Sequence, residues 1–512
     1  RAAAQLIRVR YAPSKGHYDL AAVKHSAAED KNAEAPPRSA VGDFDTAFAT
    51  APVRFDATYT TADESHSMME PHATIAAWDG DQLSLWTSTQ MVNWSINDMA
   101  ATLRIPKDKI RLMSPYIGGG FGAKLWIRAD ALLAALGARA ARRPVKVTLQ
   151  RALIPNNTVH RAATIQRLHI GATPDGKIVA LGHECWSGNL KGVGGEASAV
   201  PSRSIYASAN RMTSNLVAEL DLPEGNAMRA PGEASGMATI EIAMDEMAEK
   251  LGLDPIAFRA LNDTQVLPDK PGKPAPDKAG SSQSGDAQPD PHPPFSKRQL
   301  IECFRVGAQH FGWNRRNPKP AQVRDGQWLI GMGVATAFRD NLLMKSAARV
   351  RLDKRGIVTV ETDMTDIGTG SYTVIAQTAA EMMGVPIQNV VVRLGDSSFP
   401  ISCGSGGQWG GNNATAGVYA ACVKLRAMVA EQAGFSAAEA QFADGMVRTP
   451  TRSVPLAEVA GDRGLVAEDH IEYGDLDKRY QQSTFGAHFV EVGVDAYTGE
   501  TRVRRMLAVC AA

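Results

Sequence analysis

Two glycine-rich segments carry the residues best suited to chemistry in this sequence. The first glycine segment is GGGFG at residues 118–122, and the second glycine segment is GSGGQWGG at residues 404–411. Each follows a predicted strand and stands directly before a predicted helix, where unpaired backbone N–H groups and the positive end of the helix dipole attract phosphate. A shorter glycine turn lies at residues 368–370. One such loop is usually an ordinary turn, but three of them predict one extended, phosphate-bearing ligand held between two parts of the chain.

The glycine segments do not match the two commonest nucleotide-binding motifs. Lys124 follows the first glycine segment, but its neighbours are Ala123 and Leu125, so the sequence lacks a P-loop. Ala123 also stands where a dinucleotide fingerprint counted from Gly118 needs its last glycine. A nucleoside-triphosphate hydrolase and a Rossmann-type dehydrogenase are therefore disfavoured.

Other chemically capable side chains give weaker signals. The triplet GDS at residues 395–397 is similar to an esterase motif, but the sequence has no nucleophile elbow. His66 and His72 lack the spacing of a helical metal-ligand pair, so we expect structural roles for both. Asp363 and Asp366 could bind a hard cation, and capping of the neighbouring turn is the preferred interpretation.

Composition and charge limit the class of protein. The chain has 512 residues, 44% hydrophobic and 21% charged, which is typical of a folded protein of two or three domains. Lys and Arg number 55 against 54 for Asp and Glu, so neither nucleic acid nor an anionic membrane is an expected partner. Five scattered cysteines form no CxxC pair, so a metal would need ligands other than a Cys/His set. No apolar run approaches the roughly 18 residues of a membrane span.

The elements that must position the glycine segments occur twice in the same order. The first copy consists of a strand, a helix, a strand and a glycine segment, at residues 83–86, 96–103, 110–113 and 118–122. The second copy consists of a strand, the glycine turn, a helix, a strand and a glycine segment, at residues 357–362, 368–370, 371–383, 390–394 and 404–411. A further helix is expected after each glycine segment, in the second copy from about Asn413. The order predicts an internal repeat.

The repeat predicts an α+β fold of two related lobes, each made of mixed sheets packed with helices. We expect lobe 1 at residues 40–265 and lobe 2 at residues 297–512, joined by a Pro/Gly/Ser-rich linker at residues 266–296. A stripe of apolar residues at helical spacing predicts a core-facing helix that ends at Gly252. The stripe consists of Met237, Ile240, Met244, Met247 and Leu251.

Both ends of the sequence look cut. Residues 1–9 predict the tail of a helix followed by an alternating strand, with no leader before them. Residues 503–512 look like part of another strand. We therefore expect the sequence to be a piece of a longer protein.

Six motifs in this order resemble those of the molybdopterin-binding subunits of the xanthine dehydrogenase/aldehyde oxidase family. They are Glu70-Pro71-His72, Gln90, residues 118–124, residues 228–232, residues 366–370 and residues 404–413. The resemblance covers nearly the whole chain and points to the large subunit of bacterial periplasmic aldehyde oxidoreductases. It implies molybdenum-cofactor-binding lobes, with residues 1–12 as the remnant of an upstream hammerhead domain and residues 13–39 as a connecting segment.

The resemblance also implies a reaction. A molybdenum hydroxylase of this kind oxidises aldehydes to carboxylic acids with water as the oxygen donor. Its molybdenum is held by the dithiolene of molybdopterin cytosine dinucleotide, which accounts for the missing Cys/His set. Its electrons pass to 2Fe-2S clusters and FAD on separate partner subunits, in a heterotrimer. The compartment stays open between periplasm and cytoplasm, with the periplasm favoured by the resemblance.

By the same resemblance, individual residues receive roles. Gln90 corresponds to the glutamine that hydrogen-bonds the oxo group of the metal. Arg229 and Arg339 correspond to arginines at the substrate side, and a structural ion pair is the alternative for each. Leu125 and Trp126 would line the substrate pocket; purine-oxidising members have Glu at the first of these positions, so an apolar residue favours an aldehyde or an apolar heterocycle. The implied cofactor contacts are Gly119, Gly120, Phe121, Gly122, Gly368, Thr369, Gly370, Ser405, Gly406, Gly407 and Gly410.

One departure from the family concerns its base. Members carry a catalytic glutamate near the C-terminus, and Glu472, Glu491 and Glu500 do not match it. We therefore expect this base beyond Ala512, and we expect the 512-residue piece alone to be inactive. Two alternatives stay open: a hydroxylase of an aromatic N-heterocycle of the isoquinoline or nicotinate type, and a non-catalytic cofactor-binding protein that lacks the base.

Overall fold

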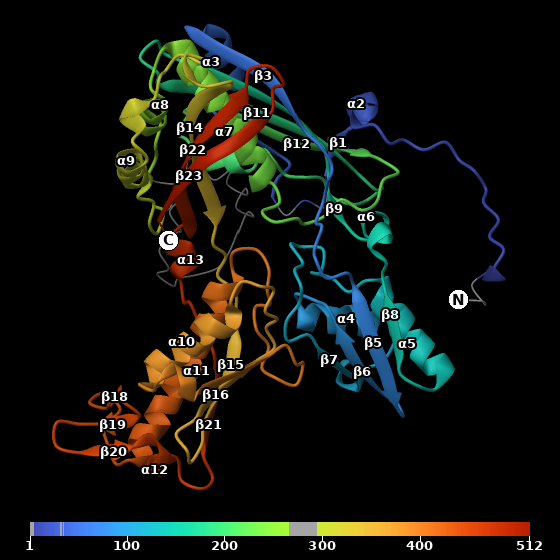
Figure 1. The fold of residues 1–512 in the computed structure, drawn as a ribbon, viewed down its shortest axis with the longest axis vertical. Helices are drawn as coiled ribbons and strands as arrows, with labels where there is room; N and C mark the ends of the chain where they lie inside the picture. Colours follow the sequence, from blue (N-terminus) through green and yellow to red (C-terminus); the bar gives the residue numbers. More distant parts are fainter. Residues whose placement is uncertain (1–4, 31–32, 34, 266–293, 512) are drawn as a thin grey trace, which may run out of the picture.

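The structure is a computed structural model that describes residues 5–30, 33, 35–265 and 294–511. Figure 1 shows an upper body built on two sheets and, below it, two separate α/β units. Nearly all of the linker predicted at residues 266–296 lies outside the described residues. In the described part of the chain, no helix has the length and apolar character needed to cross a membrane.

The first α/β unit contains the first copy of the repeat. Its sheet has the order β7-β6-β5-β8, with β6 and β7 parallel and the other neighbours antiparallel. Two helices pack on it and bury side chains such as Leu85, Met99 and Leu112. The elements are β5 (Ala73–Asp79), β6 (Gln82–Thr87), α4 (Val92–Leu103), β7 (Ile110–Met113), α5 (Ala129–Ala141) and β8 (Val145–Thr148).

The second α/β unit repeats this topology. Its sheet has the order β17-β16-β15-β21, again with one parallel pair, β16 and β17. The elements are β15 (Ala347–Leu352), β16 (Val358–Thr362), α10 (Ser371–Met383), β17 (Val390–Leu394), α11 (Gly410–Gln432) and β21 (Leu465–His470). A small insertion before the last strand comprises β18 (Gln441–Ala443), β19 (Met446–Arg448), β20 (Ser453–Pro455) and α12 (Leu456–Ala460). The predicted internal repeat is therefore confirmed by matching strand order and direction.

The upper body contains two further sheets. One has the order β1-β12-β11-β10-β3, with β2 also paired to β12, and the other has the order β13-β14-β22-β23. The strands of the first sheet are β1 (Ala28–Glu29), β2 (Arg38–Val41), β3 (Val53–Thr61), β10 (Thr164–Ala172), β11 (Ile178–Asn189) and β12 (Arg211–Glu219). Those of the second are β13 (Val323–Asp325), β14 (Trp328–Asp340), β22 (Ser483–Asp495) and β23 (Thr501–Ala511). The α+β class is thus confirmed.

Short elements complete the chain. They include the two-stranded pair β4 (Glu64–Ser65) and β9 (His160–Arg161), and the helices α2 (Leu20–Val23), α3 (Phe44–Thr50), α6 (Ile154–Asn157), α8 (Pro255–Leu261), α9 (Leu300–Phe311) and α13 (Leu476–Arg479). The strand expected at the end of the sequence is present as β23. The strand expected near its start is not: residues 7–19 form no regular structure, and Ile7 is 69% exposed, because no neighbouring strand pairs with this segment in the described structure.

The methionine stripe lies on α7 (Glu233–Leu251), between the two sheets of the upper body. Met237, Met244 and Met247 pack in one core with Phe338 of β14 and Phe485 of β22. The helix ends at Gly252, which adopts a left-handed backbone with φ of 70°. The core assignment of the stripe is confirmed, and this core joins residues from both predicted lobes.

A buried charge cluster strengthens the same junction. Glu241 of α7 accepts from Arg259 Nε at 2.7 Å and from the backbone N–H of Thr336 on β14 at 2.8 Å. It also accepts from the hydroxyl of Tyr206. Both Glu241 and Arg259 are buried, and Arg259 has a second counter-charge in Asp245, whose carboxylate lies 2.7 Å from it and is 40% exposed.

We predict that Glu241→Ala lowers the free energy of unfolding by about 3–5 kcal/mol, because it leaves Arg259 with only the partly exposed Asp245 and leaves the buried N–H of Thr336 without its acceptor. Chemical denaturation of the full-length protein would measure the change. Glu249→Ala, an exposed position on the same helix, is the matched control and should change stability by less than about 0.5 kcal/mol. Equal effects of the two substitutions would contradict the assignment.

Candidate cofactor site

A short backbone pairing joins the two α/β units directly before their glycine segments. The N–H of Ser114, just after β7, donates to the carbonyl of Gly395, just after β17, at 2.7 Å. Farther along, the N–H of Ile117 donates to the carbonyl of Asp366 at 3.0 Å. The pairing therefore brings the glycine turn next to the residues that lead into the first glycine segment.

The GDS triplet belongs to this joint. Asp396 forms an ion pair with Arg111 at 2.7 Å, and the hydroxyl of Ser397 accepts from the N–H of Leu112 at 3.0 Å. The N–H of Ser397 in turn donates to the Leu112 carbonyl at 3.0 Å. These contacts give the triplet a structural role, as expected from its weak similarity to an esterase motif.

Gln90 links the two glycine segments. Its Oε1 accepts from the N–H of Gly122 at 3.0 Å, and its Nε2 donates to the carbonyl of Ser405 at 2.7 Å. The N–H of Ser405 donates back to the Gln90 carbonyl at 3.0 Å, and the Ser405 hydroxyl donates to the carbonyl of Thr365 beside the glycine turn. Gln90 is only 2% exposed. All three glycine-containing turns therefore meet at one buried junction.

Two glycines of the first segment are required by close approach. A Cβ atom at Gly122, whose φ is 108°, would lie 2.1 Å from the carbonyl oxygen of Ala227. A Cβ atom at Gly120 would lie 2.4 Å from Oε1 of Gln90. Between them, Phe121 has a left-handed backbone with φ of 56° and a ring that is 41% exposed. This strained conformation holds the aromatic ring at the surface of the segment.

The turns leave several backbone donors without a protein partner, as judged from the described residues. These amides belong to Gly119, Gly120 and Phe121, to Thr369, Gly370 and Ser371, and to Gly406, Gly407 and Gln408. The helices α10 and α11 begin at or close to the last two groups, so their dipoles favour a negative ligand there. Around Gly368, Gly370 and Gly411 the space is open. The site can therefore accept an extended anionic ligand.

Lys124 does not contribute to this donor set. It is fully buried, and its Nζ donates to Oε2 of Glu70 at 2.7 Å and to the Glu70 carbonyl at 3.0 Å. Burial lowers the pKa of Lys124, and Glu70 opposes that shift. The same Oε2 accepts from the N–H of Gly118 at 3.0 Å, so this pair braces the first glycine segment.

The expected helix directly after the first glycine segment is wrong. α5 begins at Ala129, and residues 123–128 form turns in between. The carbonyl of Lys124 accepts from the N–H of Gln90 at 2.7 Å, so this backbone is bonded to another segment and not within a helix. The first segment therefore offers amides without a helix dipole, whereas the second precedes α11 directly.

Arg229 lies beside the first glycine segment. Its N–H donates to the carbonyl of Phe121 at 2.9 Å, and its side chain is exposed. The turn that carries it is held from behind by Arg161, whose NH2 group donates to the carbonyls of Met228 at 2.6 Å and Arg229 at 2.9 Å. Glu196 pairs with Arg161 at 2.9 Å. Arg161 and Glu196 carry no sequence signal, because neither lies in a recognisable motif.

Arg339 lies beside the second glycine segment. It stands opposite Thr484 in the pairing of β14 with β22, and the Thr484 hydroxyl accepts from Nε2 of Gln408 at 2.6 Å. Its guanidinium forms an ion pair with Glu233, the first residue of α7. Burial raises the pKa of Glu233, and Arg339 opposes that shift. The structural ion pair considered for Arg339 is thus present.

The two residues predicted for the substrate pocket are close to the second glycine segment. Leu125 is 7% exposed, and its Cδ2 lies 3.1 Å from the position of a Cβ atom at Gly406. Trp126 packs against Trp94 with ring centroids 6.0 Å apart. We refer to Leu125 and Trp126 as the apolar wall, and their role toward a substrate stays a prediction.

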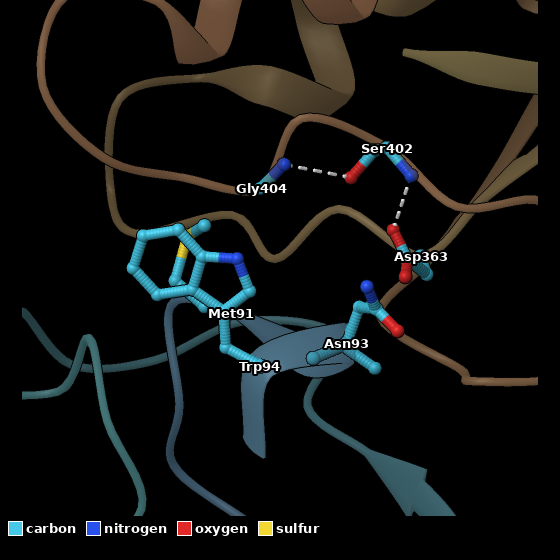
Figure 2. A pocket seen from close by; sticks show the side chains of 7 residues that line it. Met91, Asn93, Trp94, Asp363, Ser402 and Gly404 are labelled. Carbon is cyan, nitrogen blue, oxygen red and sulfur yellow. Dashed lines mark hydrogen bonds between the residues drawn. The ribbon is translucent and has the colours of Figure 1, made fainter. Parts of the chain in front are cut away.

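Asp366 caps the neighbouring glycine turn, as expected, whereas Asp363 does not and instead binds a backbone N–H 39 residues away. Asp366 accepts from the N–H of Gly368 at 2.8 Å, and Asp363 accepts from the N–H of Ser402 at 2.6 Å. Figure 2 shows Asp363 at the edge of a small pocket between the two α/β units, with Gly404 and Trp94 in its lining. Burial raises the pKa of Asp363 to about 6, against the opposing bond from Ser402.

The two histidines also have structural roles. The ring nitrogens of His66 face the carbonyls of Val159 at 3.0 Å and Ala227 at 2.8 Å. Nε2 of His72 lies 3.4 Å from the carbonyl of Ala123. Among the residues with described coordinates, no group of three or more His, Cys, Asp or Glu side chains could hold a metal ion.

Comparisons with known proteins decide the family. Models of the molybdopterin cofactor-binding domain match residues 24–263 and 306–512. The aldehyde oxidoreductase molybdenum-binding subunit PaoC of Escherichia coli (strain K12) is 59% identical over 512 residues, covering 100% of this chain and 67% of that protein. The chain belongs to the molybdenum-binding subunits of the xanthine dehydrogenase/aldehyde oxidase family.

More distant relatives agree with the fold. The probable hypoxanthine oxidase XdhD of Escherichia coli (strain K12) is 27% identical over 94% of this chain and 50% of its own length. The crystal structure of quinoline 2-oxidoreductase from Pseudomonas putida 86 superposes with a TM-score of 0.82 at 22% identity, covering 99% of this chain and 68% of that chain. Aldehyde oxidoreductase from Desulfovibrio gigas superposes with a TM-score of 0.76 at 20% identity, covering 99% and 55%.

The site fits the cofactor of this family. Molybdopterin carries phosphate, and the three turns present unpaired amides, with open space around Gly368, Gly370 and Gly411. When bound, its dithiolene would supply ligands for the metal. Nε2 of Gln90 uses one of its two hydrogens on Ser405 and retains the other for a ligand.

We predict that Gln90→Ala destabilises the cofactor-free full-length protein by about 1–3 kcal/mol for each buried backbone group that it leaves without a partner. The two groups are the N–H of Gly122 and the carbonyl of Ser405. Thermal unfolding would measure the loss, with Gln377→Ala on the exposed face of α10 as the control. If Gln90→Ala unfolded at the same temperature as Gln377→Ala, the stabilising role of the Gln90 junction would be refuted.

A second prediction concerns Asp363, whose pKa rises on folding from 3.8 to about 6. The folded state then holds this proton more tightly than the unfolded state, so the contribution of Asp363 to stability is present below pH 3.8 and lost as the pH rises through about 6. Asp363→Asn should therefore gain roughly 1–3 kcal/mol relative to wild type between pH 4 and pH 7. Chemical denaturation at several pH values would test this prediction. A difference in stability between Asp363→Asn and wild type that did not change with pH would contradict it.

Proposed function

We propose that the full-length protein is the catalytic subunit of a molybdenum hydroxylase that oxidises aldehydes to carboxylic acids, with water as the oxygen donor. The observation that carries this proposal is the junction at Gln90, which gathers unpaired amides of three turns from both α/β units around one site. Membership of the family and 59% identity to an aldehyde oxidoreductase subunit support the same reaction.

We propose molybdopterin cytosine dinucleotide as the form of the cofactor. The amides at the start of α10 and before α11 would bind its phosphates, and the first glycine segment with Gln90 would face the metal end. When bound, the cofactor supplies the redox centre at which a carbon is hydroxylated. The protein residues would bind and orient it through turns that the Gln90 junction holds together.

The substrate side is proposed at the two arginines and the apolar wall. Leu125 is buried against the second glycine segment, so a purine would find no polar partner at this position. Arg229, exposed beside Phe121, could stabilise negative charge on a carbonyl oxygen. Separate partner subunits with 2Fe-2S clusters and FAD would carry the electrons away.

The direct test uses the full-length protein isolated with the subunits that co-purify with it. Metal analysis should find molybdenum, acid hydrolysis should release a cytidine nucleotide, and benzaldehyde should be oxidised with an artificial electron acceptor. Absence of molybdenum would overturn the proposed function. Another nucleotide in place of cytidine would overturn only the cofactor form.

Gly370→Ala should lower the molybdenum content strongly without a comparable loss of fold. Gly370 has φ of 82°, and an alanine there strains the turn whose amides lie at the start of α10. Gly434→Ala is the matched control, because Gly434 has φ of 74° with equally open surroundings but follows the far end of α11. Both variants should lose about 1–2 kcal/mol of stability. Equal molybdenum content in the two proteins would contradict the cofactor role of the glycine turn.

A further inference from the structure

The ion pair between Arg339 and Glu233 lies next to both glycine segments. Arg339 is near the end of β14, opposite the Thr484 that receives a hydrogen bond from Gln408 of the second segment. Glu233 directly follows the turn whose Arg229 N–H binds Phe121 of the first segment. The pair therefore connects the two sides of the site, and it joins residues that are 106 positions apart in the sequence.

The pair is partly withdrawn from water. The Arg339 side chain is 21% exposed and the Glu233 side chain is 19% exposed. Nearby acids are engaged elsewhere: Glu196 pairs with Arg161, and Asp340 accepts from Gln481 and Ser483. In the described part of the chain, Glu233 is the carboxylate within ion-pair distance of Arg339.

A free arginine at this position would affect the product of the proposed reaction. A carboxylic acid product is an anion at neutral pH, and a guanidinium binds a carboxylate through two parallel hydrogen bonds. A partly buried guanidinium binds such an anion more strongly than an exposed one does, because water screens the charge less. An unpaired Arg339 would therefore retain the product and favour anionic ligands.

We propose that Glu233 is a specificity-determining residue that neutralises Arg339, so that the site accepts neutral aldehydes and releases carboxylate products. The inference rests on the proposed function for the identity of the product. Helix α7 is already joined to β14 by Glu241, which binds the N–H of Thr336 and pairs with Arg259. The inference therefore gives Glu233 a role other than joining these two elements.

The experiment compares two ligands of equal shape, benzoate and benzamide, which differ in charge. In the full-length protein with its co-purifying subunits, Glu233→Gln should bind benzoate about tenfold more tightly than wild type in titration calorimetry. Benzamide affinity should change less than about twofold. The KM for neutral benzaldehyde should stay within about twofold, while inhibition by benzoate becomes stronger.

Several variants separate this role from a structural one. Glu233→Asp keeps the charge and should bind benzoate like wild type, and Glu249→Gln on the exposed face of α7 should also leave binding unchanged. The double variant Glu233→Gln with Arg339→Gln should lose the increase in benzoate affinity. If Glu233→Gln does not fold, Glu233→Ser provides the neutral residue in the first turn of the helix.

Unchanged benzoate affinity in a folded Glu233→Gln protein, or an equal gain for benzamide, would overturn the inference. Failure of the wild-type protein to oxidise any aldehyde would instead overturn the proposed function. The calorimetric comparison is read without turnover, so the two failures are distinguishable.

Discussion

The structure depends on one buried side-chain amide that serves two distant parts of the chain. Gln90 accepts from the first glycine segment and donates to the second, and its backbone exchanges a further bond with Ser405. Because a buried amide without partners is costly, this geometry is strongly favoured once the two α/β units meet. The unpaired amides of the three turns then point to one site, which neither unit could form alone.

Buried charges support this arrangement from behind. Glu70 with Lys124 braces the first glycine segment, and Arg161 with Glu196 holds the turn that carries Arg229. Lys124, Arg161 and Glu196 are buried, and each has a counter-charge beside it, since an unpaired ion would not remain buried; the Glu70 side chain is 43% exposed. A lysine that follows a glycine-rich segment binds phosphate in other folds. Here Lys124 instead pairs with Glu70 and so supports the first glycine segment. Backbone amides are left as the groups that we propose for binding the phosphates of the cofactor.

The predicted elements agree best with the structure where their sequence signals lie within a few residues of each other. Three predicted elements have the same bounds in the structure: the strands at residues 110–113 and 390–394 and the helix at residues 371–383. Their signals are alternation, helical spacing and the cap at Gly384, and each signal lies within a few residues of its element. The predicted repeat followed from the same signals. The expected strand near Ile7 failed for lack of a partner, since a strand is stable only when a neighbour pairs with it.

The sequence by itself determined the order of the elements, the glycine turns and the family, since each is encoded in neighbouring residues. Only the tertiary structure decided which side chains touch across the site. The partnership of Arg339 with Glu233, the support from Arg161 and the inward path of Lys124 depend on contacts between segments far apart in the chain. Such contacts have no local pattern, because their geometry follows from how the sheets and helices pack.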